Sequence, residues 1–340
     1  MPVPNIPFPP MEAELVRELP QGEGWQYEPK WDGFRGVFEN AGGELALWSR
    51  KDRPLLRYFP ELRPLGELLP PVSAVDGEIV IARDGALDFD AMQMRLHPAE
   101  SRIRRLSAEI PAQLVVFDVL LWDGEPVWQR PLEERRARVE ALAGFRISPA
   151  TRDVAEARGW LDRFEALGLD GVIAKRLGVP YLPGSRDGVV KVKPYRTADC
   201  VIVGFRWSEK ADGRISTLLL GLYGDDGELD FVGHCSGFPA PVRRQLEEEL
   251  PKLKAPGHLS DKRIPGGQSR WSRGKELDWN PVRPELVVEV RFDKLEGNRF
   301  RHGTKFIRFR PDKDPEQCTW DQVRPRRKRN DPTVEKLLAR

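Results

Sequence analysis

The spacing of apolar positions divides the chain into two parts. In the first part, short apolar or alternating runs stand between Gly, Pro and Asp residues, a pattern typical of β-strands. Apolar residues at helix-like spacing predict two helices between these runs, at residues 132–142 and 154–167. The predicted strands lie at residues 37–38, 45–49, 74–82, 113–121, 170–175 and 188–193. Alternating strands and helices indicate an α+β domain built on a mixed sheet.

The pattern changes after Pro194. Gly- and Asp-rich turns now separate the strands, and one helix is predicted at residues 242–253. The five predicted strands lie at residues 199–207, 216–223, 229–235, 286–292 and 305–310. Five strands with one helix are typical of a small Greek-key barrel of the OB type. We therefore predict domains at residues 1–196 and 197–316, followed by a basic tail at 317–340.

Composition favours a soluble protein of two domains. The 340 residues are 40% hydrophobic and 32% charged, which suits buried cores in domains of roughly 100–200 residues. No apolar run approaches the roughly 20 residues of a membrane helix, and the Pro-interrupted N-terminus is unlike a signal peptide. Three cysteines, odd in number and far apart, argue against a disulfide framework or a zinc knuckle and favour a reducing cytoplasm.

The net charge of +2 excludes little, but the basic residues are clustered. Residues 262–275, 291–310 and 324–329 are rich in Arg and Lys, with Trp or Phe among the first two groups. Such clusters suit the phosphate backbone of a nucleic acid. A solvated face with a frayed tail explains the charge equally well, so charge alone does not decide between these interpretations.

The strongest chemical signal is the run EPKWDGFR, from Glu28 to Arg35. A lysine, Lys30, precedes an Asp-Gly turn, and Arg35 lies on the outgoing segment, so an amine and a guanidinium surround one small space. An unprotonated lysine amine can attack the α-phosphorus of a nucleotide, while a neighbouring cation holds a phosphate or ribose oxygen. Taken alone, the run is also explained by a surface turn with ordinary charges.

Further motifs follow in order. Asp76 and Glu78 are two apart on a predicted strand, so both carboxylates project to one face, where a cation or a hydrogen bond has to meet them. Lys191 and Lys193 alternate in the same way. Two ammonium groups on one side suit a pentavalent phosphate, with a solvated face as the alternative. Phe117 lies in an apolar run and is explained equally well as a core residue.

Together with Ser49-Arg50 and the run from Asp170 to Lys175, these motifs resemble the covalent nucleotidyltransferase superfamily in order and spacing. That superfamily contains DNA ligases, RNA ligases and mRNA capping enzymes. The resemblance covers nearly the whole chain, and its size and layout are most similar to the minimal two-domain bacterial ATP-dependent DNA ligases of the C type. It implies an ATP-grasp-like nucleotidyltransferase domain followed by a C-terminal OB-fold β-barrel.

The resemblance implies roles for residues around a nucleotide. Lys30 matches the lysine that becomes AMP-lysine, and Glu28 matches the residue that recognises the adenine amino group. Arg35 and Arg50 match the arginines that hold ribose and phosphate, and Phe117 matches the aromatic residue that stacks on the purine. An exposed turn lysine, a solvent-facing strand residue and ordinary surface cations are the plain alternatives.

The resemblance also implies a metal and phosphate site. Glu78 matches a ribose and metal ligand, and Asp170 stands where the family usually has Glu as the second metal-binding carboxylate. Because Asp is shorter by one methylene, the position of the ion or a bridging water is expected to differ. Lys191 and Lys193 match the lysines that hold the α-phosphate. The expected metal is Mg²⁺ or Mn²⁺, held by carboxylates and phosphates.

Near the C-terminus, Arg308, Arg310 and Lys313 resemble the last ligase motif, on the barrel. We expect the two arginines to share a strand face. In the family this segment swings over ATP, orients the leaving pyrophosphate, and moves away so that the barrel can bind DNA. ATP is expected rather than NAD, because NAD-dependent ligases carry an N-terminal nicotinamide-binding domain and a four-cysteine zinc module. Here twenty-nine residues precede Lys30 and the cysteines are isolated. GTP is not excluded.

We therefore expect an ATP-dependent DNA ligase that seals 5′-phosphate/3′-hydroxyl nicks in duplex DNA during repair, through AMP-lysine and adenylated DNA. The expected setting is the bacterial cytoplasm, at the nucleoid, as a monomer on nicked double-stranded DNA, with repair proteins as further partners and no membrane. One alternative is an RNA ligase or an RNA-capping guanylyltransferase with the same lysine chemistry. The other is a non-catalytic OB-fold nucleic-acid-binding protein, which has no use for Lys30.

Overall fold

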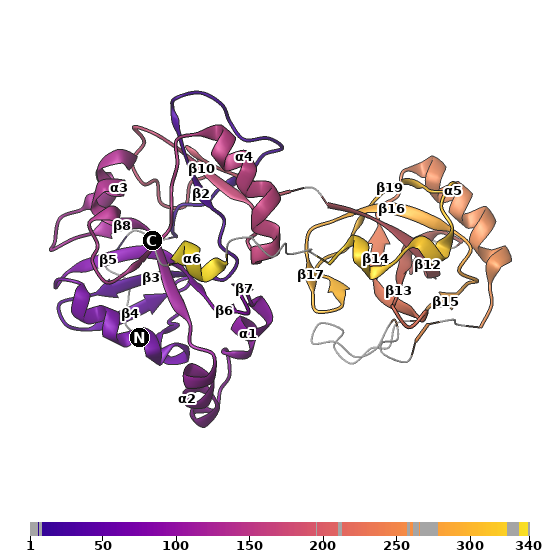
Figure 1. Cartoon of the computed structure of the whole chain (residues 1–340), viewed down its shortest axis with the longest axis horizontal. Helices are drawn as coiled ribbons and strands as arrows, with labels where there is room; N and C mark the ends of the chain where they lie inside the picture. Colours follow the sequence, from indigo (N-terminus) through magenta and orange to yellow (C-terminus); the bar gives the residue numbers. More distant parts are fainter. Residues whose placement is uncertain are drawn as a thin grey trace. The chain divides into compact units, whose positions relative to one another are not determined.

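The chain forms two compact units (Figure 1). The first contains residues 1–194 and 325–340, and the second contains residues 195–324. The structure, a computed structural model, describes residues 6, 9–194, 196–209, 213–256, 259–260, 265, 278–324 and 333–338. The predicted basic stretches 262–275 and 325–329 therefore lie outside the described residues, apart from Pro265.

Two sheets make up the centre of the first unit. The larger sheet has the strand order β4-β3-β5-β8-β9 and is antiparallel except for the parallel pair β8 and β9. The second sheet has the order β1-β11-β10-β2. The strands of the larger sheet are β3 (Phe34–Asn40), β4 (Leu45–Trp48), β5 (Ser73–Val80), β8 (Gln113–Leu121) and β9 (Arg146–Ile147). Those of the second sheet are β1 (Glu14–Leu15), β2 (Trp25–Pro29), β10 (Val172–Arg176) and β11 (Val189–Val192), and a small ribbon pairs β6 (Ala82–Arg83) with β7 (Ala86–Leu87).

The two faces of the larger sheet bury different cores. One face packs Phe38, Val75 and Ile79 under the helices of the unit. The other face contributes Val37 to a cluster that also holds Val189 and Ile173 of the second sheet. Since period-two alternation sends neighbouring side chains to opposite faces, polar residues of both sheets meet beside this shared cluster.

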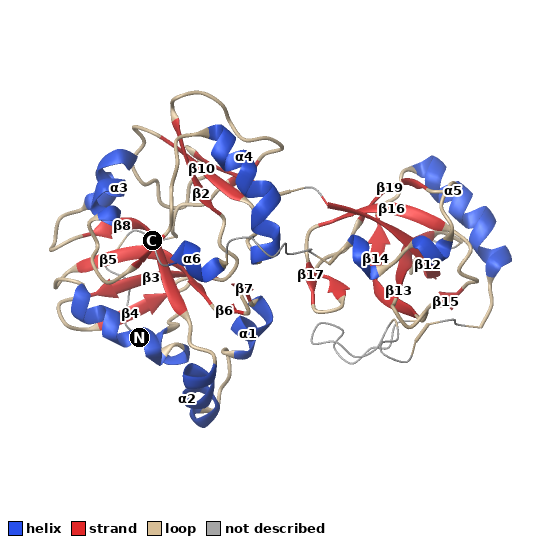
Figure 2. Cartoon of the chain, viewed as in Figure 1, coloured by secondary structure: helices blue, strands red, loops and turns tan. Residues whose placement is uncertain are grey.

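Helices lie outside the strands of the first unit (Figure 2). Helix α3 packs against β8, and its first residue follows Pro131, a residue that suits a helix start because its missing N–H would have no partner there. The α-helices are α1 (Phe89–Met94), α2 (Glu100–Glu109), α3 (Leu132–Glu140), α4 (Val154–Arg163) and α6 (Val334–Leu338). The 3₁₀ helices are η1 (Leu56–Tyr58), η2 (Pro60–Leu68), η3 (Val127–Gln129) and η4 (Phe164–Leu167).

The last helix, α6, belongs to the first unit although the second unit precedes it in the chain (Figure 1). The backbone N–H of Val334 donates to the Gly85 carbonyl oxygen across 3.0 Å. Val334 and Leu338 are both buried and join the cluster around Trp160 and Leu167. Burial of two aliphatic side chains stabilises this docking by about 3–6 kcal/mol.

The second unit is a strongly curved antiparallel sheet with the order β14-β13-β12-β16-β19. Among the described residues, backbone pairing between its edge strands is limited to the bridge between Cys235 and Thr304, so regular pairing does not close a barrel. The strands are β12 (Arg196–Trp207), β13 (Ile215–Tyr223), β14 (Leu229–Ser236), β15 (Asn280–Pro281), β16 (Val287–Phe292), β17 (Leu295–Glu296), β18 (Arg299–Phe300) and β19 (Lys305–Phe309). The helices are α5 (Ala240–Glu249), η5 (Leu250–Leu253), η6 (Pro315–Gln317) and η7 (Trp320–Gln322).

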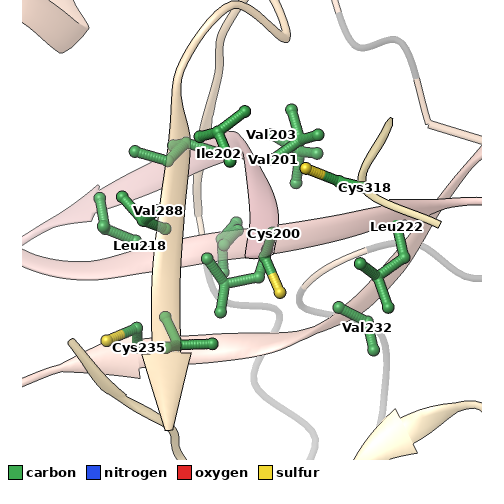
Figure 3. Close-up of a cluster of buried hydrophobic side chains, with 14 of the residues drawn as sticks. Cys200, Val201, Ile202, Val203, Leu218, Leu222, Val232, Cys235, Val288 and Cys318 are labelled. Atoms are coloured by element: carbon green, nitrogen blue, oxygen red, sulfur yellow. The ribbon is translucent and has the colours of Figure 1, made fainter. Parts of the chain in front are cut away.

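All three cysteines lie in the core of the second unit (Figure 3). Cys200, Cys235 and Cys318 are free thiols among Val and Leu side chains. Burial raises the pKa of the Cys318 thiol to about 12. At neutral pH this thiol is protonated and packs as a small apolar side chain.

The predicted α+β architecture is confirmed, with differences at the ends of elements. The predicted helix at 242–253 begins at Ala240 and becomes 3₁₀ from Leu250, because Pro251 has no N–H to continue an α-helix. The residues at 317–324, assigned to a tail from sequence, pack into the second unit through Cys318 and Trp320, which are 0% and 2% exposed. No described helix has the length and apolar character needed to cross a membrane.

Candidate active site

Lys30 and Asp170 are brought together by the pairing of β2 with β10. The Lys30 N–H donates to the Gly171 carbonyl oxygen (2.9 Å), and the Asp170 N–H donates to the Lys30 carbonyl oxygen (2.8 Å). Lys30 Nζ then lies 2.5 Å from Asp170 Oδ2, and Lys193 Nζ lies 3.1 Å from Asp170 Oδ1. Gly171 has a φ of +135°, and a Cβ there would collide with the Val192 carbonyl oxygen. Only glycine combines this φ with so close an approach to the Val192 carbonyl oxygen.

Arg35 is held in one orientation by a buried network. Its Nε and Nη2 donate to the two carboxylate oxygens of Asp76 at 2.6 and 2.5 Å. The Tyr181 hydroxyl donates to Asp76 Oδ2 (2.7 Å) and accepts from the Met11 N–H (2.9 Å). Although burial opposes the charge, Asp76 holds the pKa of Arg35 above its ordinary value. A bidentate guanidinium of this kind presents a fixed positive group to a ligand.

Glu78 lies opposite Arg35 in the register of β3 and β5. Burial raises the pKa of the Glu78 carboxyl to about 7, against the lowering effect of Lys30 and Arg35. Gly33 makes this proximity possible, because a Cβ there would overlap the Ile79 carbonyl oxygen and touch the Glu78 side chain. The Asp-Gly turn after Lys30 therefore lets that loop lie directly on β5.

A second part of the site contains Glu28, Lys175 and Phe117. Glu28 is 2% exposed, so it is a buried acid and not the solvent-facing strand residue of the plain alternative. Lys175 Nζ lies 2.9 Å from Glu28 Oε2, donates to the Phe117 carbonyl oxygen (3.2 Å), and sits 4.8 Å from the centre of the Phe117 ring. The Arg35 guanidinium carbon is 4.7 Å from the same centre. Phe117 is half-buried between cations and belongs to none of the apolar clusters of the described residues.

The two lysines expected on one strand face lie at the end of β11. Strand β11 ends at Val192, so Lys191 lies on the strand and Lys193 lies beyond its end. Both nevertheless approach Lys30. Burial lowers the pKa of Lys191, and the charges of Lys30 and Lys193 lower it further. The ammonium groups of Lys30 and Lys193 therefore contact the Asp170 carboxylate, and Lys191 lies close enough to both lysines to feel their charge.

Arg50 does not belong to the group of charged residues around Asp170. It is 61% exposed, and its Nη1 lies 4.0 Å from Glu12 Oε1. Glu12 also pairs with Arg186 across 3.1 Å. Arg50 thus lies in a surface cluster, with a guanidinium that is accessible to a ligand.

The cations of the last motif are paired within the second unit. Arg310 Nη1 lies 2.8 and 2.9 Å from the two oxygens of Asp199, and Lys313 Nζ lies 2.7 Å from Asp199 Oδ2. Arg308 Nε donates to Glu289 Oε2 across 2.7 Å. The acids that the two arginines contact, Glu289 and Asp199, stand opposite each other in the register of β12 and β16, which agrees with the expected shared strand face.

The carboxylates of the first unit fit only part of a metal site. Among the described residues, no group of three or more His, Cys, Asp or Glu side chains is placed to hold an ion. Mg²⁺ commonly takes one or two carboxylates and completes its octahedron with substrate phosphates and water. Glu78 and Asp170 fit that donor set, provided that a phosphate-bound ion displaces the lysines from Asp170.

The sequence interpretation missed two members of the site, Lys175 and Tyr181, and did not identify the partner of a third, Asp76. Lys175 ends one of the motifs, yet its role emerges only from its contacts with Glu28 and Phe117. Asp76 shares a strand face with Glu78, and its partner Arg35 is 41 positions away. Tyr181 carries no local signal, because the Met11 and Asp76 groups it joins are over a hundred positions distant.

Comparison with known proteins shows the family of this chain. A family model described as "ATP dependent DNA ligase domain" matches residues 10–193, and one described as "ATP dependent DNA ligase C terminal region" matches residues 211–313. DNA ligase C2 of Mycolicibacterium smegmatis is 46% identical over 337 residues, covering 93% of this chain and 94% of that protein. DNA ligase C of Mycobacterium tuberculosis is 44% identical over 338 residues, with the same coverage.

A solved structure, mycobacterial DNA ligase D complexed with ATP and MES, superposes with a TM-score of 0.50 at 29% identity, covering 93% of this chain and 98% of that one. The two matched regions span most of the chain. The chain therefore belongs to the ATP-dependent DNA ligase family, and the resemblance read from its motifs is confirmed. It is an enzyme of the class that joins DNA strands with ATP.

Proposed function

We propose that this chain seals 5′-phosphate/3′-hydroxyl nicks in duplex DNA, with Lys30 as the residue that carries AMP. The observation behind this assignment is the position of the Lys30 amine. It lies 2.5 Å from Asp170, beside Lys193, and close enough to Glu78 and Lys191 to shift the pKa of each. An amine so placed among cations faces a site built for a phosphate.

The first step joins Lys30 to the nucleotide. The hydrogen bond to Asp170 orients Nζ, and once Nζ loses its proton its lone pair attacks the α-phosphorus of ATP in line. A P–N bond forms, the bond to pyrophosphate breaks, and the electron pair leaves with pyrophosphate. Lys191, Lys193 and Arg35 stabilise the charge on the phosphate oxygens, since charge stabilisation dominates such transfers.

Two transfers complete the reaction. An oxygen of the 5′-phosphate at the nick attacks the same phosphorus, the P–N bond breaks, and AMP passes to the DNA. The 3′-hydroxyl then loses its proton and attacks the 5′-phosphorus, forming the phosphodiester as AMP departs. Glu78 and Asp170 would hold Mg²⁺ or Mn²⁺ together with phosphate oxygens, and such an ion would supply further positive charge at the phosphate.

The remaining residues bind the nucleotide around this centre. Glu28 accepts a hydrogen bond from the adenine amino group, and the Phe117 ring stacks on the purine. Arg35 and the accessible Arg50 contact ribose and phosphate. The cations of the last motif, in the second unit, orient pyrophosphate in the first step; they are Arg308, Arg310 and Lys313.

The proposed setting follows from the same assignment. Residues 1–196 act as the adenylation domain, residues 197–316 as the OB-fold domain, and residues 317–340 as a C-terminal segment. The enzyme works as a monomer on nicked duplex DNA of the bacterial nucleoid, with repair proteins as further partners.

The test is a nick-sealing assay on a 5′-phosphorylated, nicked DNA duplex with ATP and Mg²⁺ or Mn²⁺. Lys30→Ala should abolish both joined product and covalent labelling of the protein by ATP, whereas Lys336→Ala, a change of an exposed lysine on α6, should keep both. Full sealing by Lys30→Ala would remove Lys30 from the mechanism. Sealing of nicked RNA but not DNA, or labelling by GTP but not ATP, would instead favour an RNA ligase or a capping enzyme.

A further inference from the structure

One buried amide near the site has no role in the mechanism above. Gln26 lies on β2 and is 4% exposed, and its Nε2 donates to Glu28 Oε1 across 2.8 Å. A buried side-chain amide destabilises a fold unless it is hydrogen-bonded. Glu28 already has a cationic partner in Lys175, so charge pairing alone does not require Gln26.

The strand geometry shows what Gln26 adds. Residues 26, 28 and 30 alternate along one face of the chain, and Gln26 is paired across the sheet with Lys175. Gln26 holds one oxygen of Glu28, and Lys175 holds the other at 2.9 Å. The terminal torsion of a glutamate is soft when nothing restrains it. Two donors on different oxygens fix the plane of the carboxylate and leave about two of its four acceptor positions free.

A fixed carboxylate can distinguish purines. Adenine carries an amino donor at position 6, where guanine carries an oxygen acceptor. A carboxylate with a fixed orientation attracts the amino group of adenine and repels the oxygen of guanine. Sites that offer a buried polar group to a substrate donor reject the analogue that lacks it, because that group then stays unpaired.

We propose that Gln26 is a positioning residue that sets the preference of this enzyme for ATP over GTP by locking the orientation of Glu28. This inference rests on the proposed function, in which Glu28 meets the base. Gln26 itself touches no nucleotide. It acts through Glu28, in concert with Lys175, which also fixes the Phe117 carbonyl oxygen.

The experiment measures formation of the covalent protein–nucleotide adduct with α-labelled ATP and GTP in the full chain. Gln26→Leu and Gln26→Met both remove the amide and keep a side chain of similar length. We expect kcat/KM for ATP to fall about tenfold, mainly through KM, which corresponds to the loss of one hydrogen bond to a charged group. We expect kcat/KM for GTP to differ from the wild-type value by no more than about threefold. The ratio of kcat/KM for ATP to kcat/KM for GTP, the ATP/GTP ratio, should therefore fall in both variants.

Asn40→Leu is the matched control, since Asn40 is a buried amide of the same unit that donates to the Leu69 carbonyl oxygen far along β3. It should lower the melting temperature and leave the ATP/GTP ratio unchanged. An unchanged ratio in both folded Gln26 variants would overturn the positioning role and reduce Gln26 to a structural partner. If the wild type forms no adduct with either nucleotide, the proposed function itself fails, which is a separate result.

Discussion

Charged residues are used differently in the two units of this ligase. In the first unit, the acids that orient cations are nearly inaccessible: Asp76 is 0%, Glu28 2% and Asp118 3% exposed. In the second unit, Arg308 is 58% exposed in its pair with Glu289. Arg310 and Lys313, by contrast, share the Asp199 carboxylate, which is 8% exposed and so resembles the buried acids of the first unit.

The difference suits two kinds of task. Buried pairs hold side chains in one place, because separating them leaves an uncompensated charge in a low-dielectric interior. Exposed pairs contribute little to stability and exchange their partners readily. The first unit therefore holds these acids and their cations in fixed positions, whereas the exposed pair of Arg308 and Glu289 in the second unit can separate at little cost.

The largest expected effect on stability concerns the buried pair of Asp118 and Arg135. Arg135 Nε and Nη2 donate to the two carboxylate oxygens of Asp118 at 2.8 and 3.2 Å, and both side chains are under 5% exposed. Asp118→Ala should lower the free energy of unfolding by about 3–5 kcal/mol, measured by urea denaturation. Glu125→Ala, which removes exposed pairs with Arg130 and Arg138, should cost at most about 1 kcal/mol. An equal loss of unfolding free energy in the two variants would contradict the difference between buried and exposed ion pairs.

The next effect concerns Glu78 and depends on pH. Burial raises its pKa from 4.5 to about 7, so the folded state binds more protons than the unfolded state between these values. The free energy of unfolding should therefore fall as pH rises through this window. Glu78→Gln removes the titration and should be more stable than the wild type by about 2–3 kcal/mol at pH 8, and no more stable at pH 4. Urea denaturation across the range checks this.

The same variant links stability to catalysis. Glu78→Gln should lose nick sealing, because the amide cannot replace a carboxylate beside the phosphates. A variant that gains stability and loses activity would show that the site tolerates an unfavourable buried acid for its chemistry. A pH-independent difference in stability would show that Glu78 does not titrate in this window.

The smallest effect on stability is expected in the second unit. Arg308→Ala removes an ion pair whose arginine is mostly exposed, and it should change the free energy of unfolding by about 0–1 kcal/mol. Formation of the lysine–AMP adduct should nevertheless slow, since Arg308 is assigned to the leaving pyrophosphate. A stopped assay with α-labelled ATP measures this. A large stability loss with normal adduct formation would reverse the proposed roles.

Local patterns predicted most of the longer strands and three of the six described α-helices, α3, α4 and α5. Alternating apolar runs predicted β5, β8, β10 and β13 within a few residues. They missed β2, where polar Gln26 and Glu28 face inward to pair with each other. They missed α6 because a five-residue helix is stable only through burial of Val334 and Leu338.

For the site, sequence by itself indicated the residues to which we assign the chemistry: the motif around Lys30, the acids Glu78 and Asp170, and the lysines at 191 and 193. It could do so because each motif is short and its spacing is local. Only the tertiary structure decided which of them meet. Asp170 reaches Lys30 across 140 positions, Tyr181 braces Asp76 across 105, and Gln26 joins the site only by sharing Glu28 with Lys175. Such contacts depend on strand pairing and on the burial of charge. Neither can be predicted from a short stretch of sequence, because both are set by residues far apart in the chain.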